Sequence, residues 1–465
     1  MDPKILLINS RVKNDRVKFL PLGLAYLSAV LEKNSFDVKV IDANALQMED
    51  NCLINTVKRM SPDIIGLTAM TGGIEYVWEI AKMCKLVLPN ATIILGGPHP
   101  TILPEESIQK LFVDIVVIGE GEETMKEIAV SRQKNSSLKN VKGIAYKEDG
   151  RVIITPRREN IANLDDLPFP ARHLFPFPQL YKPDSYRKKP VARILTSRGC
   201  PYRCTFCYHG IFGKELRTRS PENVVEEIEF LKDRYGIKEF HTVDDNFNAD
   251  KKRAIAICEL LIKRKVNLPW ACAQGMRVNN LDQEFLYLMR EAGCYRTYLG
   301  IESGNQQILN NIQKDITLAM VEKAVVMVKK AKMVVGGLFM VGNYGETEET
   351  INDTINFAKK LKLDYAFFSI ATPYPGTVLR QQAIQEGRLL TKKWSDLNRY
   401  AGAAFEWKNL SKSQIDRLYR KAYRDFYLRP GYLFKRLTNF ESFKVLFRGI
   451  EIVINALHLK DIESK

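Results

Sequence analysis

The sequence contains no run of about 18 consecutive apolar residues, the length that a membrane-spanning helix needs. Its first residues read as a strand and have no signal-peptide layout. We therefore expect a cytoplasmic protein. Cysteine is sparse, with 8 among 465 residues, and five of the eight stand singly in apolar segments. Such scattered cysteines exclude a disulfide framework and are expected to be buried free thiols: Cys52, Cys84, Cys258, Cys272 and Cys294.

Two further motifs are missing, and their absence argues against two classes of ligand. No G-x-G-x-x-G fingerprint occurs, so a nicotinamide dinucleotide has little support. No basic run alternates with stacking aromatics, so no nucleic-acid partner is expected, although the formal net charge is +16. The lysines and arginines are spread along the chain, which favours solvated surface side chains.

The other three cysteines lie close together in the stretch Ser197-Arg-Gly-Cys-Pro-Tyr-Arg-Cys-Thr-Phe-Cys-Tyr-His209. Their spacing is C-x3-C-x2-C, at Cys200, Cys204 and Cys207. A short apolar run over 191–196 predicts a strand that leads into this stretch. Three thiolates on one loop can hold three irons of a four-iron cluster and leave the fourth iron open, because fully ligated clusters use four cysteines.

Two other interpretations of the three thiols remain. They could bind zinc with His209 as the fourth ligand, although zinc loops usually come as paired C-x2-C units and no second unit occurs. They could also be unreactive core thiols. The interleaved charges of Arg198 and Arg203 disfavour burial in a core.

The cysteine loop, with Phe206 beside the last cysteine, resembles the radical S-adenosylmethionine (SAM) superfamily. The resemblance implies a 4Fe-4S cluster whose open iron takes the amino and carboxylate groups of SAM. It implies reductive cleavage of SAM to a 5′-deoxyadenosyl radical, with electrons from a low-potential donor of the flavodoxin or ferredoxin type.

The first 140 residues alternate strand and helix patterns with short connections. This alternation predicts an α/β domain with a doubly wound, Rossmann-like parallel sheet. Ligands of such sheets bind at the carboxyl ends of the strands. The loops expected there are Thr68-Ala-Met-Thr-Gly-Gly73, Gly96-Gly-Pro-His-Pro-Thr101 and Gly119-Glu-Gly-Glu122.

These loops resemble those of the cobalamin-binding domain that often precedes a radical SAM domain. The resemblance places Thr68, Gly96 and Gly97 along the slot for the nucleotide tail of cobalamin. The D-x-H-x-x-G motif, whose histidine ligates cobalt in other cobalamin domains, is missing, and the first 170 residues hold one histidine, His99. The resemblance then implies cobalamin without a protein imidazole. A domain of this shape that binds no cobalamin is the alternative.

Further along the chain, residues 141–192 are expected to form a hairpin and a proline-rich linker in extended form. Residues 193–390 resume the strand–helix alternation with six units, which predicts a partial (β/α)6 barrel of the TIM type. Residues 391–465 carry helical patterns, notably Lys412–Phe426 and Ser442–His458. The second of these helices is expected to pack over the barrel mouth; an interfacial helix on an anionic membrane is the other hypothesis.

The barrel strands end in polar residues, which is where barrel enzymes place their chemistry. The resemblance assigns Asp244 and Asp245 to the SAM amino group. It assigns Arg277 to the SAM carboxylate, a pairing that suits a guanidinium. Glu302 and Ser303 match a family position for ribose or methionine contact.

The resulting prediction is a cobalamin-dependent radical SAM C-methyltransferase that acts on an unactivated carbon of a small molecule or lipid. The same parts would also suit ring formation, oxidation or C–C joining on a lipid or tetrapyrrole, because the chemistry belongs largely to the cofactors. A zinc-stabilised binding protein is the non-enzymatic alternative.

Overall fold

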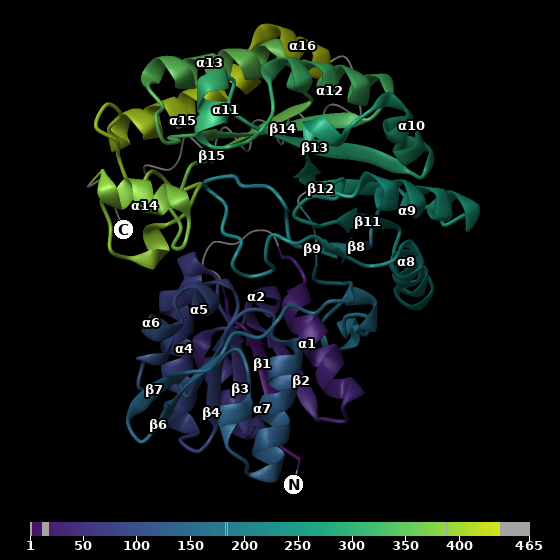
Figure 1. Ribbon diagram of the computed structural model, residues 1–465. Coiled ribbons are helices and arrows are strands. Elements are labelled where there is room, and N and C mark those ends of the chain that lie inside the picture. The colour runs from purple at the N-terminus through teal and green to yellow at the C-terminus, as the bar shows by residue number, and fades with distance from the viewer. Residues whose placement is uncertain (1, 12–17, 182, 184, 387, 438–465) are drawn as a thin grey trace. The chain divides into compact units, whose positions relative to one another are not determined.

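The computed structural model describes residues 2–11, 18–181, 183, 185–386 and 388–437 (Figure 1). Contacts divide the chain into two units, one of residues 1–200 with 209–240 and one of residues 201–208 with 241–465. Both units have an α/β architecture, as the sequence predicts. The unit boundary crosses the cysteine loop.

The first unit contains a seven-stranded sheet in the order β2-β1-β3-β4-β5-β6-β7. Its first five strands pair in parallel and the last two form an antiparallel hairpin. The strands are β1 (Ile5–Asn9), β2 (Val38–Asp42), β3 (Ile64–Thr68), β4 (Thr92–Gly96), β5 (Ile115–Val117), β6 (Ile144–Glu148) and β7 (Arg151–Ile154). The strand order reverses between β1 and β3, so the crevice of a doubly wound sheet lies outside the carboxyl ends of these two strands.

Helices cover both faces of this sheet, which explains why its central strands are nearly continuous Ile, Leu and Val runs. Helix α1 packs against α7, and α3 packs against α4. The helices are α1 (Leu22–Lys33), α2 (Ala43–Leu46), α3 (Asp50–Met60), α4 (Ile74–Val87), α5 (Pro98–Ile102), α6 (Pro104–Ile108) and α7 (Glu122–Lys134). The same unit also contains α8 (Pro221–Tyr235), which packs against β8 and not against this sheet.

In the described residues of the proline-rich segment over 155–190, short 3-10 turns are the only helical elements and no strand occurs, as the composition predicts. It does not lie loosely on the surface, however. Leu164 and Leu167 pack against Tyr26 and Val30 of α1, and Phe175 is also buried. The segment, expected to be an extended linker, instead contains several turns and contributes apolar side chains to a core.

All six strands predicted for the barrel are present: β8 (Val191–Ile194), β11 (Glu239–Thr242), β12 (Trp270–Met276), β13 (Cys294–Glu302), β14 (Val334–Val341) and β15 (Tyr365–Ile370). The last five follow chain order across the sheet, β15-β14-β13-β12-β11, and β12 to β15 pair in parallel. Helices follow the strands, with α12 and α13 on the outer side of the sheet (Figure 1). These helices are α9 (Lys251–Lys263), α10 (Gln283–Glu291), α11 (Gln306–Asn311), α12 (Leu318–Lys330) and α13 (Glu348–Lys360).

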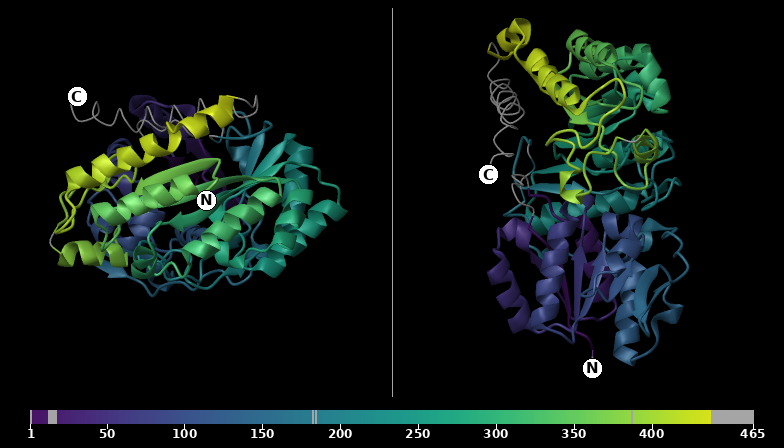
Figure 2. Two further views of the ribbon diagram at one scale, coloured as in Figure 1. Left: turned by 90° about the horizontal axis from the view of Figure 1, so that it is seen from above. Right: turned by 90° about the vertical axis from the view of Figure 1, so that its left-hand side faces the viewer.

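Helix α15 (Lys412–Tyr427) covers the outermost strand, β15, of this open barrel (Figure 2, left). The Tyr423 hydroxyl accepts a hydrogen bond from the Phe368 amide (3.1 Å) and donates to the Phe368 carbonyl (2.9 Å). One helical turn later, the Tyr427 hydroxyl does the same with Ala366, at 3.2 and 3.0 Å. The helix therefore satisfies backbone groups of β15 that an edge strand would otherwise leave open. Two shorter helices, α14 (Val378–Gln385) and α16 (Pro430–Leu437), flank it in the chain.

Three sequence-based expectations have different outcomes here. The predicted helix Lys412–Phe426 is confirmed as α15, whereas Ser442–His458 and its membrane hypothesis lie outside the described residues. No helix in the described part of the chain is both long and apolar enough to span a bilayer. Four of the five lone cysteines are buried, but Cys52 is exposed on α3, so that expectation is wrong for Cys52.

Candidate active site

The chain enters the cysteine loop through Gly199, which has a φ of +89°. A Cβ at this position would lie 2.1 Å from the carbonyl oxygen of Glu215, which no side chain tolerates. Glycine is therefore needed for both its backbone conformation and its space. The half-buried Cys200 follows directly.

Two buried arginines stand opposite each other just before the cysteines. Strand β9 (Ser197–Arg198) pairs antiparallel with β10 (Arg217–Thr218), which sets Arg198 against Arg217. Glu120 lies between them and accepts bonds from Arg198 Nη1 at 3.0 Å and from Arg217 Nη2 at 2.8 Å. Glu122 accepts a second bond from Arg198, at 2.6 Å. Burial opposes ionisation of Glu120, but hydrogen bonds from Arg217 and the charge of Arg198 outweigh it and lower the Glu120 pKa.

The sequence groups the loop Gly119-Glu-Gly-Glu122 with the loops that line a ligand. In the structure, its glutamates instead form buried ion pairs. Its carboxylates neutralise the arginine beside the first cysteine. Both glutamates are buried. A buried charge needs such partners, because removal from water is costly.

The second unit holds the other two cysteines. Cys204 is buried and Cys207 is exposed. Between them, Thr205 anchors the loop: its amide donates to the Ile312 carbonyl (3.1 Å) and its carbonyl accepts from the Leu379 amide (3.0 Å). A hydrogen bond from the Cys207 thiol lowers the pKa of Cys204 against the effect of burial, and the charges of Lys314 and Arg277 lower it further. Cys204 is therefore prepared to act as a thiolate ligand.

Arg277, which follows β12, lies directly beside Cys204. Its Nη1 is 3.7 Å from the Cys204 Sγ, a hydrogen-bonding distance for sulfur. Its backbone is held at both ends by the Asn248 side chain, which accepts from the Arg277 amide (3.1 Å) and donates to its carbonyl (2.9 Å). The guanidinium also stacks on Tyr202, 3.6 Å from the ring centroid. These contacts fix the guanidinium in place.

A buried ion pair completes the charged group around Cys204. Lys314 Nζ donates to Glu302 Oε1 at 2.6 Å, and the Lys314 carbonyl accepts from Arg277 Nη2. Glu302 has a φ of +68° at a register shift between β13 and β14. A non-glycine residue in this conformation is uncommon, and such strain collects at functional sites. Gly300 leaves room for the pair, since a Cβ there would lie 3.0 Å from Lys314 Nζ.

The remaining predicted SAM contacts differ in accessibility. After β11, Asp244 is buried and Asp245 is exposed. Ser303 is buried, and its hydroxyl lies 3.1 Å from that of Thr354. Phe206 is half-buried. Of the predicted site residues, the second unit therefore brings Cys204, Cys207, Arg277 and Glu302 into one network.

The sequence interpretation missed three members of this network: Lys314, Tyr202 and Asn248. Lys314 lies on a turn after α11, a helix that was also not predicted. A lone lysine among the 70 lysines and arginines carries no signal of its own. Its partner Arg277 is 37 positions earlier in the chain.

A second buried acid, Glu346, lies after β14. Its Oε2 accepts from the amides of Gly342 (2.5 Å) and Asn343 (2.8 Å). Burial outweighs these bonds and raises the pKa of Glu346 to about 8. The folded state thus keeps this proton between pH ~4.5 and ~8, where the unfolded chain has lost it.

We expect this proton to make stability fall as pH rises. The contribution is complete below pH ~4.5 and is lost by pH ~8, on the order of 4 kcal/mol in the free energy of unfolding. Denaturation midpoints at pH 5 and pH 8 measure it. In Glu346→Gln, which keeps an acceptor for both amides, the midpoint should change less between these pH values. Equal pH dependence in wild type and Glu346→Gln would contradict the assignment; Glu284→Gln, at an exposed position on α10, is the control.

The first unit places its predicted cobalamin residues side by side. Thr68 ends β3 directly opposite Gly96, which ends β4. Gly97 follows with a φ of +95°, and a Cβ there would lie 2.7 Å from Thr68 Oγ1 and 3.1 Å from the Ala69 amide. This edge of the sheet is therefore lined by backbone, which lets a bulky ligand approach closely. The residues present fit a cobalamin tail.

His99 lies in α5 and does not suit cobalt ligation. It is fully buried, edge-on against Trp78 at a centroid distance of 6.0 Å. Its Nε2 is 3.8 Å from Glu106 Oε2. Burial lowers the pKa of His99 to about 4, so the imidazole is neutral. We interpret it as part of the domain core.

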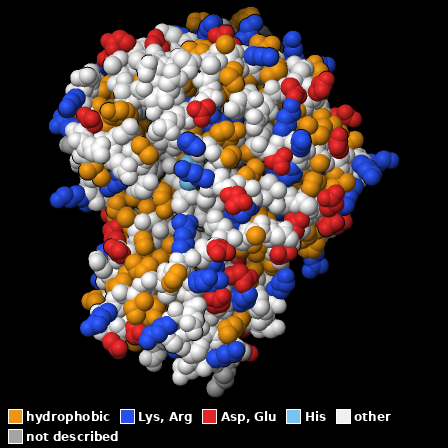
Figure 3. All heavy atoms as spheres, viewed as in Figure 1, with side chains coloured by type: hydrophobic (Ala, Val, Ile, Leu, Met, Phe, Trp, Pro, Cys, Tyr) orange, Lys and Arg blue, Asp and Glu red, His pale blue; other side chains and the backbone are white. Residues whose placement is uncertain are grey.

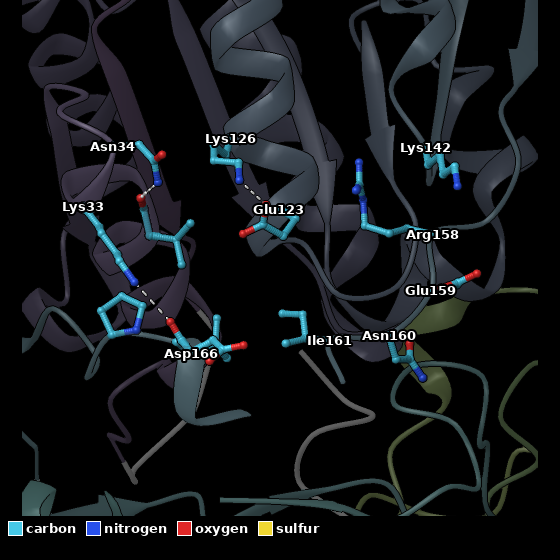
Figure 4. A pocket seen from close by; sticks show the side chains of 13 residues that line it. Lys33, Asn34, Glu123, Lys126, Lys142, Arg158, Glu159, Asn160, Ile161 and Asp166 are labelled. Carbon is cyan, nitrogen blue, oxygen red and sulfur yellow. Dashed lines mark hydrogen bonds and ion pairs between the residues drawn. The ribbon is translucent and has the colours of Figure 1, made fainter. Parts of the chain in front are cut away.

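A pocket of about 600 Å³ opens beside α1 and α7 (Figure 4). Several of its charged side chains have local partners: Lys33 donates to the Asp166 carbonyl (3.2 Å), Lys126 pairs with Glu123, and Arg158 donates to Thr124 (2.9 Å). None of the predicted site residues lines it. We assign it no function.

Comparisons with known proteins agree with this geometry. The family described as B12 binding domain matches residues 11–129, and the radical SAM superfamily matches residues 194–358. An uncharacterized methyltransferase of Pyrococcus horikoshii is 39% identical over 92% of this chain and 93% of its own. The cytidylyl-2-hydroxyethylphosphonate methyltransferase of Streptomyces wedmorensis is 31% identical over 79% and 78%. An anaerobic magnesium-protoporphyrin IX monomethyl ester cyclase of Rubrivivax gelatinosus is 32% identical over 78% and 66%.

Two solved structures share the fold. The cobalamin-dependent SAM radical enzyme OxsB, with aqua-cobalamin and SAM bound, has a TM-score of 0.76 at 20% identity and covers 98% of this chain and 72% of its own. The radical SAM methyltransferase TsrM of Kitasatospora setae, with cobalamin and a [4Fe-4S] cluster, has a TM-score of 0.70 at 20% identity and covers 83% and 76%.

Fold and cysteine loop together define a radical SAM enzyme with an N-terminal cobalamin-binding domain. Within this class, the chain belongs to the cobalamin-dependent radical SAM methyltransferase family. The predicted fold class and the enzymatic interpretation of the three cysteines are confirmed. The zinc-stabilised binding protein is not supported.

Proposed function

We propose that the protein is a C-methyltransferase that transfers a methyl group to an unactivated carbon of a small molecule. The observation that carries this proposal is the full-length similarity to methyltransferases together with the three-thiol loop. The named methyltransferase of Streptomyces wedmorensis aligns over both domains. A small molecule is the favoured substrate, and a lipid is the alternative.

The residues present fit the cofactors of the family. Cys200, Cys204 and Cys207 would hold the 4Fe-4S cluster, and the ionised Cys204 is the form that binds iron. Thr68, Gly96 and Gly97 would face the cobalamin tail. When bound, these groups supply a reducing electron for SAM cleavage and a transferable methyl group.

The chain's own contribution is to bind and orient SAM. Asp245 is exposed at the end of β11, where its carboxylate can accept a hydrogen bond from an ammonium group. Glu302 and Ser303 follow β13 and remain proposed contacts to the ribose or methionine part. The buried His99 supports cobalamin held without a protein imidazole.

The proposed electron donor is a flavodoxin- or ferredoxin-type protein. Such donors are acidic, and the net charge of +16 favours their approach at low salt. Basic and acidic side chains are interspersed on the face seen in Figure 3, so no single basic patch marks a docking site there. The proposed location is the cytoplasm, which suits reduced cysteines.

The test is anaerobic reconstitution with iron, sulfide and cobalamin, followed by incubation with SAM, a strong reductant and an extract of candidate substrates. We expect 5′-deoxyadenosine, S-adenosylhomocysteine and one product heavier by a methyl group. A cluster-loaded protein that forms no 5′-deoxyadenosine would contradict the proposal.

A second candidate function has one observation in its favour, the 32% identity to a magnesium-protoporphyrin ester cyclase. A cyclase would form 5′-deoxyadenosine without S-adenosylhomocysteine. Measuring both nucleosides against the same product therefore separates methylation from ring formation or oxidation.

A further inference from the structure

Arg277 directs its guanidinium at a cysteine of the cluster loop. Nη1 is 3.7 Å from Cys204 Sγ, and Nη2 donates to the Lys314 carbonyl. The remaining Nε is buried and has no hydrogen-bond partner among the described residues. Only 6% of Arg277 is exposed. The hydrogen-bonding capacity of Arg277 is thus turned toward the cysteine loop and the Lys314 backbone.

Charge near Cys204 is also uneven. Lys314 is 6% exposed, and its ammonium is paired with Glu302, so the network contains two cations and one anion. Inside a protein these charges are weakly screened. A net positive charge therefore remains beside the thiolate of Cys204.

We propose that Arg277 and Lys314 raise the reduction potential of the bound cluster through Cys204, and that Glu302 limits this effect. The inference rests on the proposed cluster at Cys200, Cys204 and Cys207. It gives Arg277 a positioning and tuning role at the thiolate in place of the SAM-carboxylate contact that the family resemblance implies.

The physical reason is the charge of the reduced cluster. Reduction adds an electron, and hydrogen bonds to cluster sulfurs together with nearby positive charge stabilise the more negative state. An N–H···S bond from a cation and a buried ammonium both act in this direction. The neighbouring Glu302 carboxylate acts in the opposite direction.

The experiment is a redox titration of the reconstituted cluster without SAM, monitored by electron paramagnetic resonance. Removing the positive charge of the guanidinium in Arg277→Gln should lower the equilibrium constant of one-electron reduction about tenfold, which shifts the midpoint by about 59 mV toward negative values. Glu302→Gln should shift it in the positive direction. The double variant Lys314→Met/Glu302→Gln removes one charge of each sign and should shift the midpoint less than Glu302→Gln alone.

Iron and sulfide per chain are measured for each variant, so that loss of the cluster is not mistaken for a change in potential. Lys329→Met is the matched control, because it removes a partly buried lysine that pairs with Asp364 in the same unit. Its midpoint should equal that of the wild type. Equal midpoints in wild type, Arg277→Gln and Glu302→Gln would overturn the inference and leave the proposed function standing. Failure of the wild type to bind any cluster would instead overturn the proposed function.

Discussion

Replacing Cys207 by alanine is expected to abolish 5′-deoxyadenosine formation. The cluster loop contains three cysteines and no fourth. The loss of one therefore leaves one iron without its cysteine ligand. Cys207 is exposed, and its removal should leave little packing defect. We therefore expect a folded chain with unchanged circular dichroism, reduced iron content and a rate of SAM cleavage at the background level. Anaerobic reconstitution followed by chromatography of the nucleosides measures this.

The matched control is Cys52→Ala, which also removes an exposed thiol, on α3 of the first unit. Its iron content and its rate of SAM cleavage should equal those of the wild type. Retention of SAM cleavage in Cys207→Ala would show that Cys207 is not a cluster ligand.

The largest expected loss of stability comes from Glu227→Ala in α8. Glu227 is fully buried and pairs with two buried arginines, Arg172 at 2.6 Å and Arg219. Its removal leaves both guanidinium groups buried without the carboxylate that they share. Breaking a buried pair in this way costs about 3–5 kcal/mol in the free energy of unfolding. Thermal unfolding should show a melting temperature lower by roughly 10 °C.

Glu226→Ala is the control on the same helix, at an exposed position. Exposed substitutions typically change stability by less than about 0.5 kcal/mol. A Glu227→Ala melting temperature within the range of Glu226→Ala would mean that the two arginines find water or other partners.

Much of the fold could be predicted because its signals are local. Parallel strands buried on both faces appear as short apolar runs, and β14 is such a run. The sequence marks both ends of helix α8: Ser220 is its N-cap, proline is its first residue and Gly236 follows its last residue. The six-residue α11 is too short for a periodic pattern.

The site was predictable only where a motif is contiguous. The cysteine spacing identifies the cluster loop, but the partners of its residues are distant in the chain. Arg198 and Glu120 are 78 positions apart. The sequence places Glu120 in a ligand-binding loop, and the charge of Arg198 argues against burial, yet both side chains are buried and paired. The Lys314–Glu302 pair depends on the space at Gly300 and on a local distortion of β13. Such side-chain pairings follow from tertiary packing, which periodicity does not encode.

The tyrosine contacts of α15 have a consequence for truncated forms of the protein. A bare edge strand is a template on which a second chain can add its own strand. The hydroxyls of Tyr423 and Tyr427 already bond the backbone of β15 at Phe368 and Ala366, so these groups cannot pair with an added strand. A chain cut before residue 412 would present β15 to other copies of itself, so its first failure should be aggregation through strand exchange. In the intact chain, α15 keeps these two positions of β15 closed to such pairing.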